Sequence, residues 1–320
     1  MKKILSIIIP SYKTSKYMDE CLKHFVVDSI EKDVDIFLID DGSPDDSYEK
    51  SLNYQKKYPG LFHAVHKENG GHGSVINYAI KYLIDTKYFK VVDGDDWVNE
   101  KDLLELIEYL KRVDDELIVS DYTCVYSNKT TTQKCFDTKN NNSFKGYKIT
   151  IHSSTFKTNL FKDNNIFLRE KVFYEDNEYV LFPLEFAKTI SYCECNVYQY
   201  RLGDVGQSVS ISSLLKHDND YRMIKDDIYN KYLDWIKKQI DPNLIDYGKK
   251  VLIGFYLWIF QSQILKKESK EQLLNINNEI KDQQPLFETI RRNKIYRFVS
   301  SFNFGLLTIK RFILKCKYKI

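Results

Sequence analysis

The stretch "FKVVDGDDWVNE" at residues 89–100 places three carboxylates within four positions, directly after an apolar run. The run is short and rich in β-branched and aromatic residues, as buried strands are. Asp93, Asp95 and Asp96 would repel one another at the end of such a strand unless a positive group lay among them, and a divalent cation held by oxygen ligands is the obvious candidate. The alternative is a solvated acidic turn in which Asp96 or Asn99 caps the following helix.

Similar apolar runs recur on both sides of this stretch. They lie at residues 4–10, 34–40, 61–66, 88–93 and 116–122. Between them, apolar residues recur at spacings of three and four, which places them on one face of a helix. This alternation predicts an α/β fold with a doubly wound, mainly parallel sheet, which is a Rossmann-like arrangement. Ligands of such sheets bind beyond the carboxyl ends of the strands.

Polar or glycine-rich loops follow four of the predicted strands. They are "PSY" at 10–12, "DDGS" at 40–43, "NGGHGS" at 69–74 and "DGDD" at 93–96. Carboxylates such as Asp40 and Asp41 at the mouth of a sheet can accept hydrogen bonds from a base N–H or from ribose hydroxyls, which favours nucleotide binding over a simple turn. The glycines let the backbone approach a ligand closely, and Asn77 follows one helical turn after Gly73. The loop is neither a P-loop nor a spaced dinucleotide motif.

Two later stretches add candidates. In "KVFYEDNEYV", Glu175 and Asp176 precede an apolar helical pattern, where acids can also simply complement a helix dipole. In "YQYRLGDVGQSVS", at residues 198–210, Arg201 suits bidentate pairing with phosphate oxygens, and the alternative is an ordinary surface arginine.

The length and composition predict a folded protein with two parts. Its 320 residues are 43% hydrophobic, and we expect a catalytic domain at 1–215 and a mainly helical region at 216–320. No stretch approaches the ~18 to 20 apolar residues of a membrane-spanning helix, and the N-terminus lacks the pattern of a signal peptide. The six scattered cysteines fit reduced thiols. We therefore expect a cytoplasmic protein.

The formal net charge of +3 hides an asymmetry, because residues 291–320 hold nine of the 48 basic residues and none of the 45 acidic ones. This basic tail also contains Phe, Leu and Ile, which predicts an amphipathic segment lying on an anionic membrane surface. The alternative is a basic helix packed on the body of the protein. No nucleic-acid-binding motif accompanies the charge, so we do not expect a nucleic-acid partner.

In their order and spacing, these motifs resemble the inverting glycosyltransferases of family 2, which have the GT-A fold. The matching stretches are "SIIIPSY", "FLIDDGSPDDS", "NGGHGSVINYAI", "VVDGDDWV" and "FYEDNEY", and the resemblance covers roughly residues 1–210. The pairing of "KENGGHGSVINYAI" with "YRLGDVGQSVS" is similar to a bacterial subgroup associated with cell-surface polysaccharide synthesis. Lys13 stands where many relatives have Asn, which leaves its role open. The chain has no clear Q-x-x-R-W, so a processive synthase is not expected.

The resemblance implies transfer of a sugar, with inversion, from a nucleoside-diphosphate sugar (a UDP-sugar) to a hydroxyl of a glycan or lipid-linked acceptor, in capsule, exopolysaccharide or cell-wall glycan synthesis. By this resemblance, Asp41 would contact the nucleotide base, and Pro10, Ser11 and Tyr12 would frame that base. Asp93 would contact the ribose or the water ligands of the metal, and Asp95 would coordinate the Mn²⁺ or Mg²⁺ ion. Asp176 would be the general base. The other expected donor contacts are Asn69, Gly71, Asn77, Gly94 and Arg201, and the further candidates are Asp40, Asp96 and Glu175. A lipid-linked acceptor would place the protein at the inner face of the cell membrane.

Two functions of other classes remain open. One is a phosphohydrolase with Asp93 of the Asp93-x-Asp95 pair as its nucleophile, although Trp97 stands where that pattern normally continues with Thr or Val. The other is a catalytically silent scaffold that binds a nucleotide or a glycan. The complete set of acids favours an active enzyme.

Overall fold

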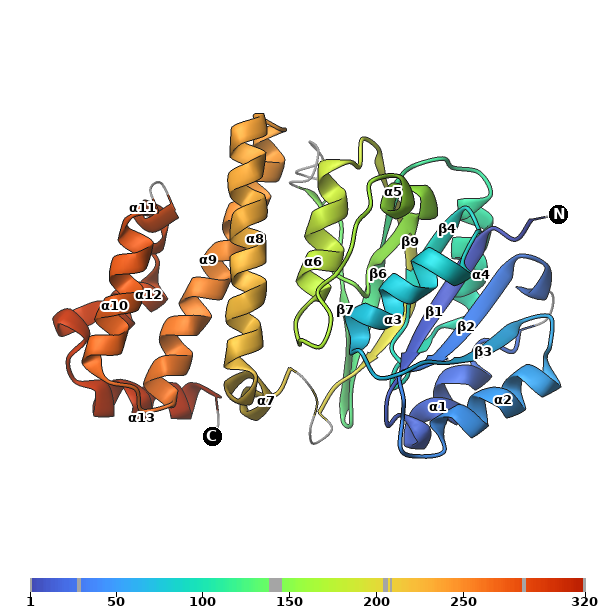
Figure 1. Ribbon diagram of the computed structural model, residues 1–320, viewed down its shortest axis with the longest axis horizontal. Helices are drawn as coiled ribbons and strands as arrows, with labels where there is room; N and C mark the ends of the chain where they lie inside the picture. Colours follow the sequence, from blue (N-terminus) through green and yellow to red (C-terminus); the bar gives the residue numbers. More distant parts are fainter. Residues whose placement is uncertain are drawn as a thin grey trace. The chain divides into compact units, whose positions relative to one another are not determined.

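The computed structural model describes residues 2–27, 30–137, 146–203, 207, 209–283 and 286–318. The chain divides into two compact units, Met1–Asp204 and Val205–Ile320. Figure 1 shows a strand-rich first unit and a helical second unit. Asp204, Val205, Gly206 and Ser208 of the predicted polar loop at 198–210 lie outside the described residues.

The first unit is built on a mixed sheet with the strand order β3-β2-β1-β4-β8-β6-β9-β5, and β7 pairs with β6. The strands are β1 Leu5–Ser11, β2 Val34–Asp40, β3 Phe62–His66, β4 Tyr88–Val91, β5 Trp97–Val98, β6 Leu117–Tyr126, β7 Lys129–Gln133, β8 Ser154–Lys157 and β9 Ile190–Arg201. Neighbours from β3 to β4 are parallel, and β8 is antiparallel to both β4 and β6. The predicted runs at 4–10, 34–40, 61–66, 88–93 and 116–122 correspond to β1, β2, β3, β4 and β6. The α/β prediction is confirmed.

The register of the central strands brings their loops to one edge. Ser11 at the end of β1 lies opposite Asp40 at the end of β2, and Asp40 lies opposite His66 at the end of β3. Every residue of β1 is buried, as expected for a central parallel strand covered on both faces. The loops after these strands therefore open on the same side.

Helices flank this sheet (Figure 1). They are α1 Ser15–Lys23, α2 Ser47–Lys57, α3 His72–Tyr78, α4 Glu100–Leu110, α5 Thr158–Asp163 and α6 Asp176–Leu181. Helix α4 begins at a cap formed by Asn99, whose side chain accepts a hydrogen bond from the backbone N–H of Asp102 at 3.1 Å. Between the two cap residues that the sequence allows, the structure therefore selects Asn99.

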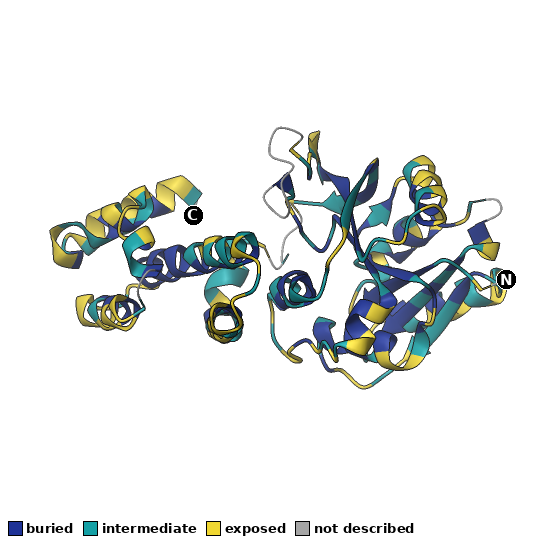
Figure 2. Cartoon of the chain, turned by 90° about the horizontal axis from the view of Figure 1, so that it is seen from above, coloured by how far each residue is buried: buried dark blue, intermediate teal, exposed yellow. Residues whose placement is uncertain are grey.

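The second unit consists of helices around α9. They are α7 Ile211–Lys216, α8 Asp218–Lys238, α9 Pro242–Leu265, α10 Lys270–Lys281, α11 Leu286–Ile290, α12 Lys294–Phe304 and α13 Leu307–Tyr318. The side chain of Asp241 caps α9 and Pro242 opens it, a favourable pair at a helix start. Its last turns are buried from Phe255 to Leu265. Figure 2 shows buried residues in the strands and in the inner helix faces. None of the described helices combines the length and apolar character that a membrane crossing needs.

Candidate active site

His72 joins two of the acidic motifs. It is the first residue of α3, and it donates from Nε2 to Asp93 Oδ1 at 2.9 Å and from Nδ1 to Glu175 Oε1 at 2.7 Å. Burial acts to lower the pKa of His72, but these two bonds outweigh it and hold the pKa well above its ordinary value. The imidazole is thus a cation between two carboxylates. The loops "NGGHGS" and "DGDD" and the start of α6 therefore meet at one point.

Asp95 lies beside this link without a partner of its own. Among the described residues, no other side chain forms a hydrogen bond or an ion pair with its carboxylate. Burial and the charge of Asp93 raise the pKa of Asp95 to about 6. The backbone carbonyl of Asp95 accepts a hydrogen bond from Arg201 Nε at 2.8 Å. A bound cation would stabilise the ionised form of this carboxylate.

Asp96 has a structural role that the sequence did not predict. It is buried, and its two oxygens are hydrogen-bonded to the hydroxyl of Tyr198 at 2.6 Å and to the backbone N–H of Arg201 at 2.7 Å. Burial and the charges of Asp95 and Asp93 raise its pKa well above the ordinary value. Asp96 thus fastens the "DGDD" loop to β9 instead of capping α4.

The donor set fits a divalent cation. Carboxylate oxygens such as those of Asp93 and Asp95 are the ligands that Mg²⁺ and Mn²⁺ favour. A second grouping adds His152, because ligand atoms of Asp93, Asp96 and His152 lie within 4.8 Å of one another. The Nδ1 atom of His152 is buried, and no described residue forms a hydrogen bond with it. Burial lowers the pKa of His152 to about 4, so its imidazole is neutral, which is the form that binds metals.

Asp176 lies at the start of α6, next to Glu175. Burial and the charge of Glu175 raise the pKa of Asp176 to about 7. The neighbouring amide of Asn177 donates to Asp176 Oδ1 at 3.1 Å. A carboxylate with a pKa near neutrality is suited to take a proton at neutral pH. The backbone of Tyr174, just before the acid pair, has a φ of 74°, which is uncommon for a residue other than glycine.

Asp41 organises the glycine-rich loop. Its carboxylate accepts hydrogen bonds from the backbone N–H of Gly70 at 2.9 Å and of Gly71 at 2.8 Å, and from Lys67 Nζ at 2.7 Å. The amide of Asn69 donates to the carbonyl of Asp41 at 2.7 Å. Gly71 has a φ of 84°, which favours glycine. The contact of Asp41 with a base stays a prediction.

Two other predicted residues are also engaged within the protein. Asp40 is fully buried and is hydrogen-bonded to His66 Nδ1 at 2.8 Å. The amide of Asn77 donates to the carbonyl of Leu168 at 2.9 Å and to Glu170 Oε1 at 3.1 Å, and it accepts from the Leu168 N–H at 3.0 Å. In the structure, these side chains therefore stabilise the surrounding loops. A contact of Asn77 with the nucleotide-sugar donor stays a prediction.

The first loop and Arg201 border the acids. The backbone N–H of Gly94 donates to the carbonyl of Pro10 at 3.2 Å, and a Cβ atom at Gly94 would lie 3.0 Å from that carbonyl oxygen. The loops pack so closely here that only glycine fits without a shift. The guanidinium of Arg201 lies over the rings of Trp97 and Tyr17, at 4.7 and 5.1 Å from their centroids. Tyr12 is 46% exposed, and Lys13 Nζ lies over its ring at 4.9 Å from the centroid.

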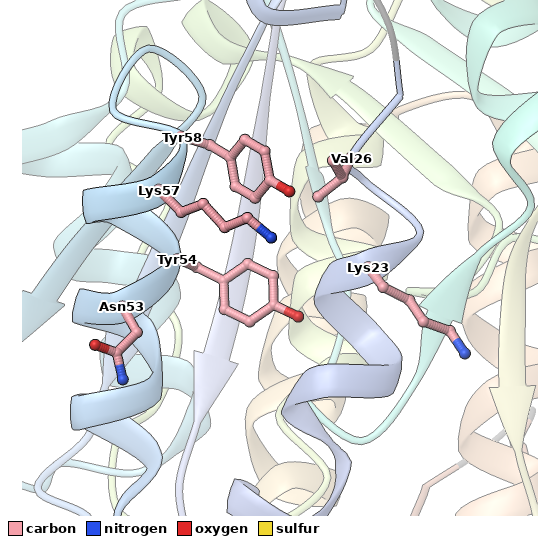
Figure 3. A pocket seen from close by; sticks show the side chains of 6 residues that line it. All are labelled: Lys23, Val26, Asn53, Tyr54, Lys57 and Tyr58. Atoms are coloured by element: carbon pink, nitrogen blue, oxygen red, sulfur yellow. The ribbon is translucent and has the colours of Figure 1, made fainter.

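A separate cavity of about 460 Å³ lies between α1 and α2 (Figure 3). It is lined by Lys23, Val26, Asn53, Tyr54, Lys57 and Tyr58. None of the acids described above lines it. These residues belong to the C-terminal parts of α1 and α2 and to the segments that follow, which run away from the ligand-binding edge of the sheet. We therefore take the acidic cluster, and not this cavity, as the candidate active site.

The chain is similar to known proteins in both sequence and fold. The family described as Glycosyl transferase family 2 matches residues 6–175, which is more than half of the chain. The poly(ribitol-phosphate) beta-glucosyltransferase of Bacillus spizizenii is 26% identical over 228 residues, which cover 69% of this chain and 36% of that protein. The chain spans less than half the length of several curated relatives that it matches.

Two solved structures share the fold. The structure of S. aureus TarS 1–349 in complex with UDP-GlcNAc matches with a TM-score of 0.67 at 20% identity, covering 99% of this chain and 90% of that one. The mannosyltransferase PcManGT from Pyrobaculum calidifontis, in complex with GDP-Man and Mn²⁺, matches with a TM-score of 0.56 at 12% identity, covering 100% and 88%. With the family match over residues 6–175, these likenesses identify the sheet as a GT-A fold. The chain belongs to glycosyl transferase family 2.

Proposed function

We propose that the protein transfers a sugar from a UDP-sugar to a hydroxyl of a glycan or a lipid-linked saccharide, with inversion, in the synthesis of a bacterial cell-surface polysaccharide such as a capsule, an exopolysaccharide or a cell-wall glycan. One observation supports this above the others. Asp176, whose pKa is raised to about 7, lies at the same edge as Asp93 and Asp95, and His72 connects the two groups through Glu175.

Asp176 acts as the general base. It takes the proton from the acceptor hydroxyl as that oxygen attacks the anomeric carbon of the donor. The bond between this carbon and the diphosphate breaks on the opposite face, so the configuration inverts in a single displacement. A base whose pKa lies near the working pH combines an ionised form with a useful proton affinity.

The donor lies across the loops at the ends of β1, β2 and β4. Tyr12 stacks on the base beside Pro10 and Ser11, Asp41 contacts the base, and Asp93 faces the ribose. Arg201 pairs with the diphosphate oxygens. Two structures that share the fold contain UDP-GlcNAc and GDP-Man, which supports a nucleotide-sugar donor here.

Asp95 and Asp93 would hold a Mn²⁺ or Mg²⁺ ion. Within the described ranges, the carboxylate of Asp95 has no side-chain partner, and its pKa is raised. A structure with the same fold contains Mn²⁺. When bound, the ion would offset the negative charge of the departing diphosphate. In the protein alone, His72 supplies the positive charge between Asp93 and Glu175.

The alternative of a phosphohydrolase is not supported. Both carboxylate oxygens of Asp93 are hydrogen-bonded, one to His72 at 2.9 Å and the other to the Tyr198 hydroxyl at 3.2 Å, which would weaken it as a nucleophile. Membership of glycosyl transferase family 2 supports an active enzyme over the alternative of a catalytically silent scaffold.

The test is a panel of nucleotide sugars in the presence of Mn²⁺, scored by thermal shift and by release of nucleoside diphosphate. We expect one UDP-sugar to raise the melting temperature and to be turned over slowly to UDP. Release of phosphate from simple phosphate esters, without turnover of any nucleotide sugar, would contradict the proposal.

We also propose a peripheral location on the cytoplasmic face of the cell membrane, where a lipid-linked acceptor would be found. The basic tail at 291–320, with nine basic residues and no acid, supports this location because anionic lipids attract such segments.

A further inference from the structure

The basic tail is not a uniformly charged surface, because part of its charge is directed into the second unit. Lys310 is 3% exposed, and its Nζ donates to the carbonyls of Val299 at 2.9 Å and Ser301 at 2.6 Å. Arg311 Nε donates to the carbonyl of Ile264 in α9 at 2.6 Å. These cations stabilise the ends of helices α12 and α9. They are therefore not available to a partner in the way that the sequence suggests.

The outward side of α13 carries an apolar stripe, which we define as Ile309, Phe312, Ile313 and Cys316. The first three are 55%, 68% and 45% exposed, and Cys316 is exposed as well. At 3.6 residues per turn, these four side chains occupy about 100° of the helix circumference. Two further exposed apolar residues precede α13: Phe302 lies near the end of α12, and Leu306 lies directly before α13.

The opposite side of α13 is packed. Leu314 is 2% exposed, and the hydroxyl of Tyr318 donates to Gln261 Oε1 of α9 at 2.7 Å. The outward direction of the apolar stripe is thus fixed by the docking of α13 on α9. An amphipathic helix with a fixed orientation and an open apolar side is a surface that lacks its partner.

Two lysines border the apolar stripe. By helical geometry, Lys315 lies beyond its Phe312 edge and Lys317 beyond its Ile313 edge, and both residues are exposed. Lys317 Nζ donates to Gln261 Oε1 of α9 at 3.0 Å, so its charge is directed partly into the second unit. No acid occurs from residue 291 to the end of the chain. An apolar stripe bordered by the exposed Lys315 suits a bilayer surface, where the apolar side chains enter the acyl region and this lysine reaches anionic headgroups. A second copy of this surface is disfavoured, because two such faces would bring like charges together.

We infer that α13 lies in the surface of an anionic lipid bilayer with its apolar stripe inserted, and that this insertion, more than the nine charges of the tail, anchors the protein. The inference specifies how the protein would bind the membrane at which the proposed function places it. Only the biological reason for membrane binding rests on the proposed function. Lipid binding is measured without donor or acceptor, so the membrane inference and the proposed sugar transfer can fail independently of each other.

The first test uses the unaltered sequence. Cys316 is the one exposed cysteine among the six, all of which lie in the described part of the chain, so an environment-sensitive fluorophore can be attached to the stripe directly. We expect a blue shift and a brighter signal with phosphatidylglycerol vesicles, and little change with phosphatidylcholine vesicles. No change with either lipid would overturn the inference. A shift that depends on protein concentration without vesicles would assign the surface to a second copy and would also overturn it.

The second test compares two double variants by sedimentation with phosphatidylglycerol vesicles. Ile309→Ser with Phe312→Ser removes the centre of the apolar stripe, and we expect the partition coefficient to fall at least about tenfold. The matched control is Leu233→Ser with Ile236→Ser on α8 of the same unit, where the side chains are 45% and 40% exposed. The control should partition as the unaltered chain does. Equal partitioning of the two variants would overturn the inference, and unchanged circular dichroism of both shows that folding is not the cause of a difference.

Discussion

At the scale of single residues, the assignment that matters most is Asp176. Asparagine has almost the same shape but cannot accept the proton of an attacking hydroxyl. A positioned base typically contributes ~10² to 10⁴-fold to a rate, so we expect Asp176→Asn to lose about that factor in sugar transfer. Donor binding, measured by calorimetry with Mn²⁺, should stay unchanged. Transfer at the rate of the unaltered enzyme would show that another group is the base.

The pKa of Asp176 also predicts a pH dependence. Burial and the charge of Glu175 raise this pKa to about 7, and a base acts only when it has lost its proton. Transfer should therefore reach a plateau above about pH 7 and fall roughly tenfold for each unit below it. Glu175→Gln removes a neighbouring negative charge, so this acid limb should move to lower pH. A profile of kcat/KM between pH 5 and 9 measures both effects, and a flat profile down to pH 5 would contradict the assignment.

Asp95 gives a separate prediction about the metal. Its carboxylate has no side-chain partner among the described residues and its pKa is raised to about 6, so a cation is the interaction that it lacks. We expect Asp95→Ala to abolish the Mn²⁺-dependent part of UDP binding in calorimetry. Glu105→Ala removes an exposed acid on α4 and should bind UDP with Mn²⁺ normally. Equal binding by both variants would assign the metal to the Asp93, Asp96 and His152 grouping.

At the scale of elements, His72 fastens the start of α3 to the loop after β4 and to the residue before α6. Its removal would leave Asp93 and Glu175 facing each other without a cation. We expect His72→Ala to lower the free energy of unfolding at pH 7 by about 1–3 kcal/mol, measured by urea denaturation. The control is His66→Ala, because His66 pairs with Asp40 but its side chain is 52% exposed, and its loss should have a smaller effect. An equal loss in both variants would contradict the linking role.

The elements show what the sequence could and could not predict. The β-branched runs predicted β1 to β4 because a buried parallel strand requires them, and parallel strands necessarily bring their following loops to one edge. The partners within that edge were not predictable. His72 is bonded to a residue 103 positions away, and Asp96 to one 102 positions away. Asp96 and Asn99 both satisfy the sequence rule for a helix cap, and only the contact of Asp96 with β9 decides between them. His152 has no neighbouring motif that would mark it.

At the scale of the whole molecule, membrane binding by the charges of the basic tail and membrane binding by the apolar stripe of α13 predict different effects of salt. Attraction by nine exposed charges, at about 1 kcal/mol for each residue near the surface, would be screened strongly, since the Debye length falls from ≈ 10 Å at 0.1 M to 3 Å at 1 M salt. The structure directs Lys310 and Arg311 inward and exposes the apolar stripe instead, and burial of apolar area does not weaken with salt in this way. We therefore expect vesicles that bind the protein at 0.1 M NaCl to retain most of it at 1 M. Sedimentation at the two salt concentrations measures this, and full release at 1 M would show that charge alone holds the protein on the membrane.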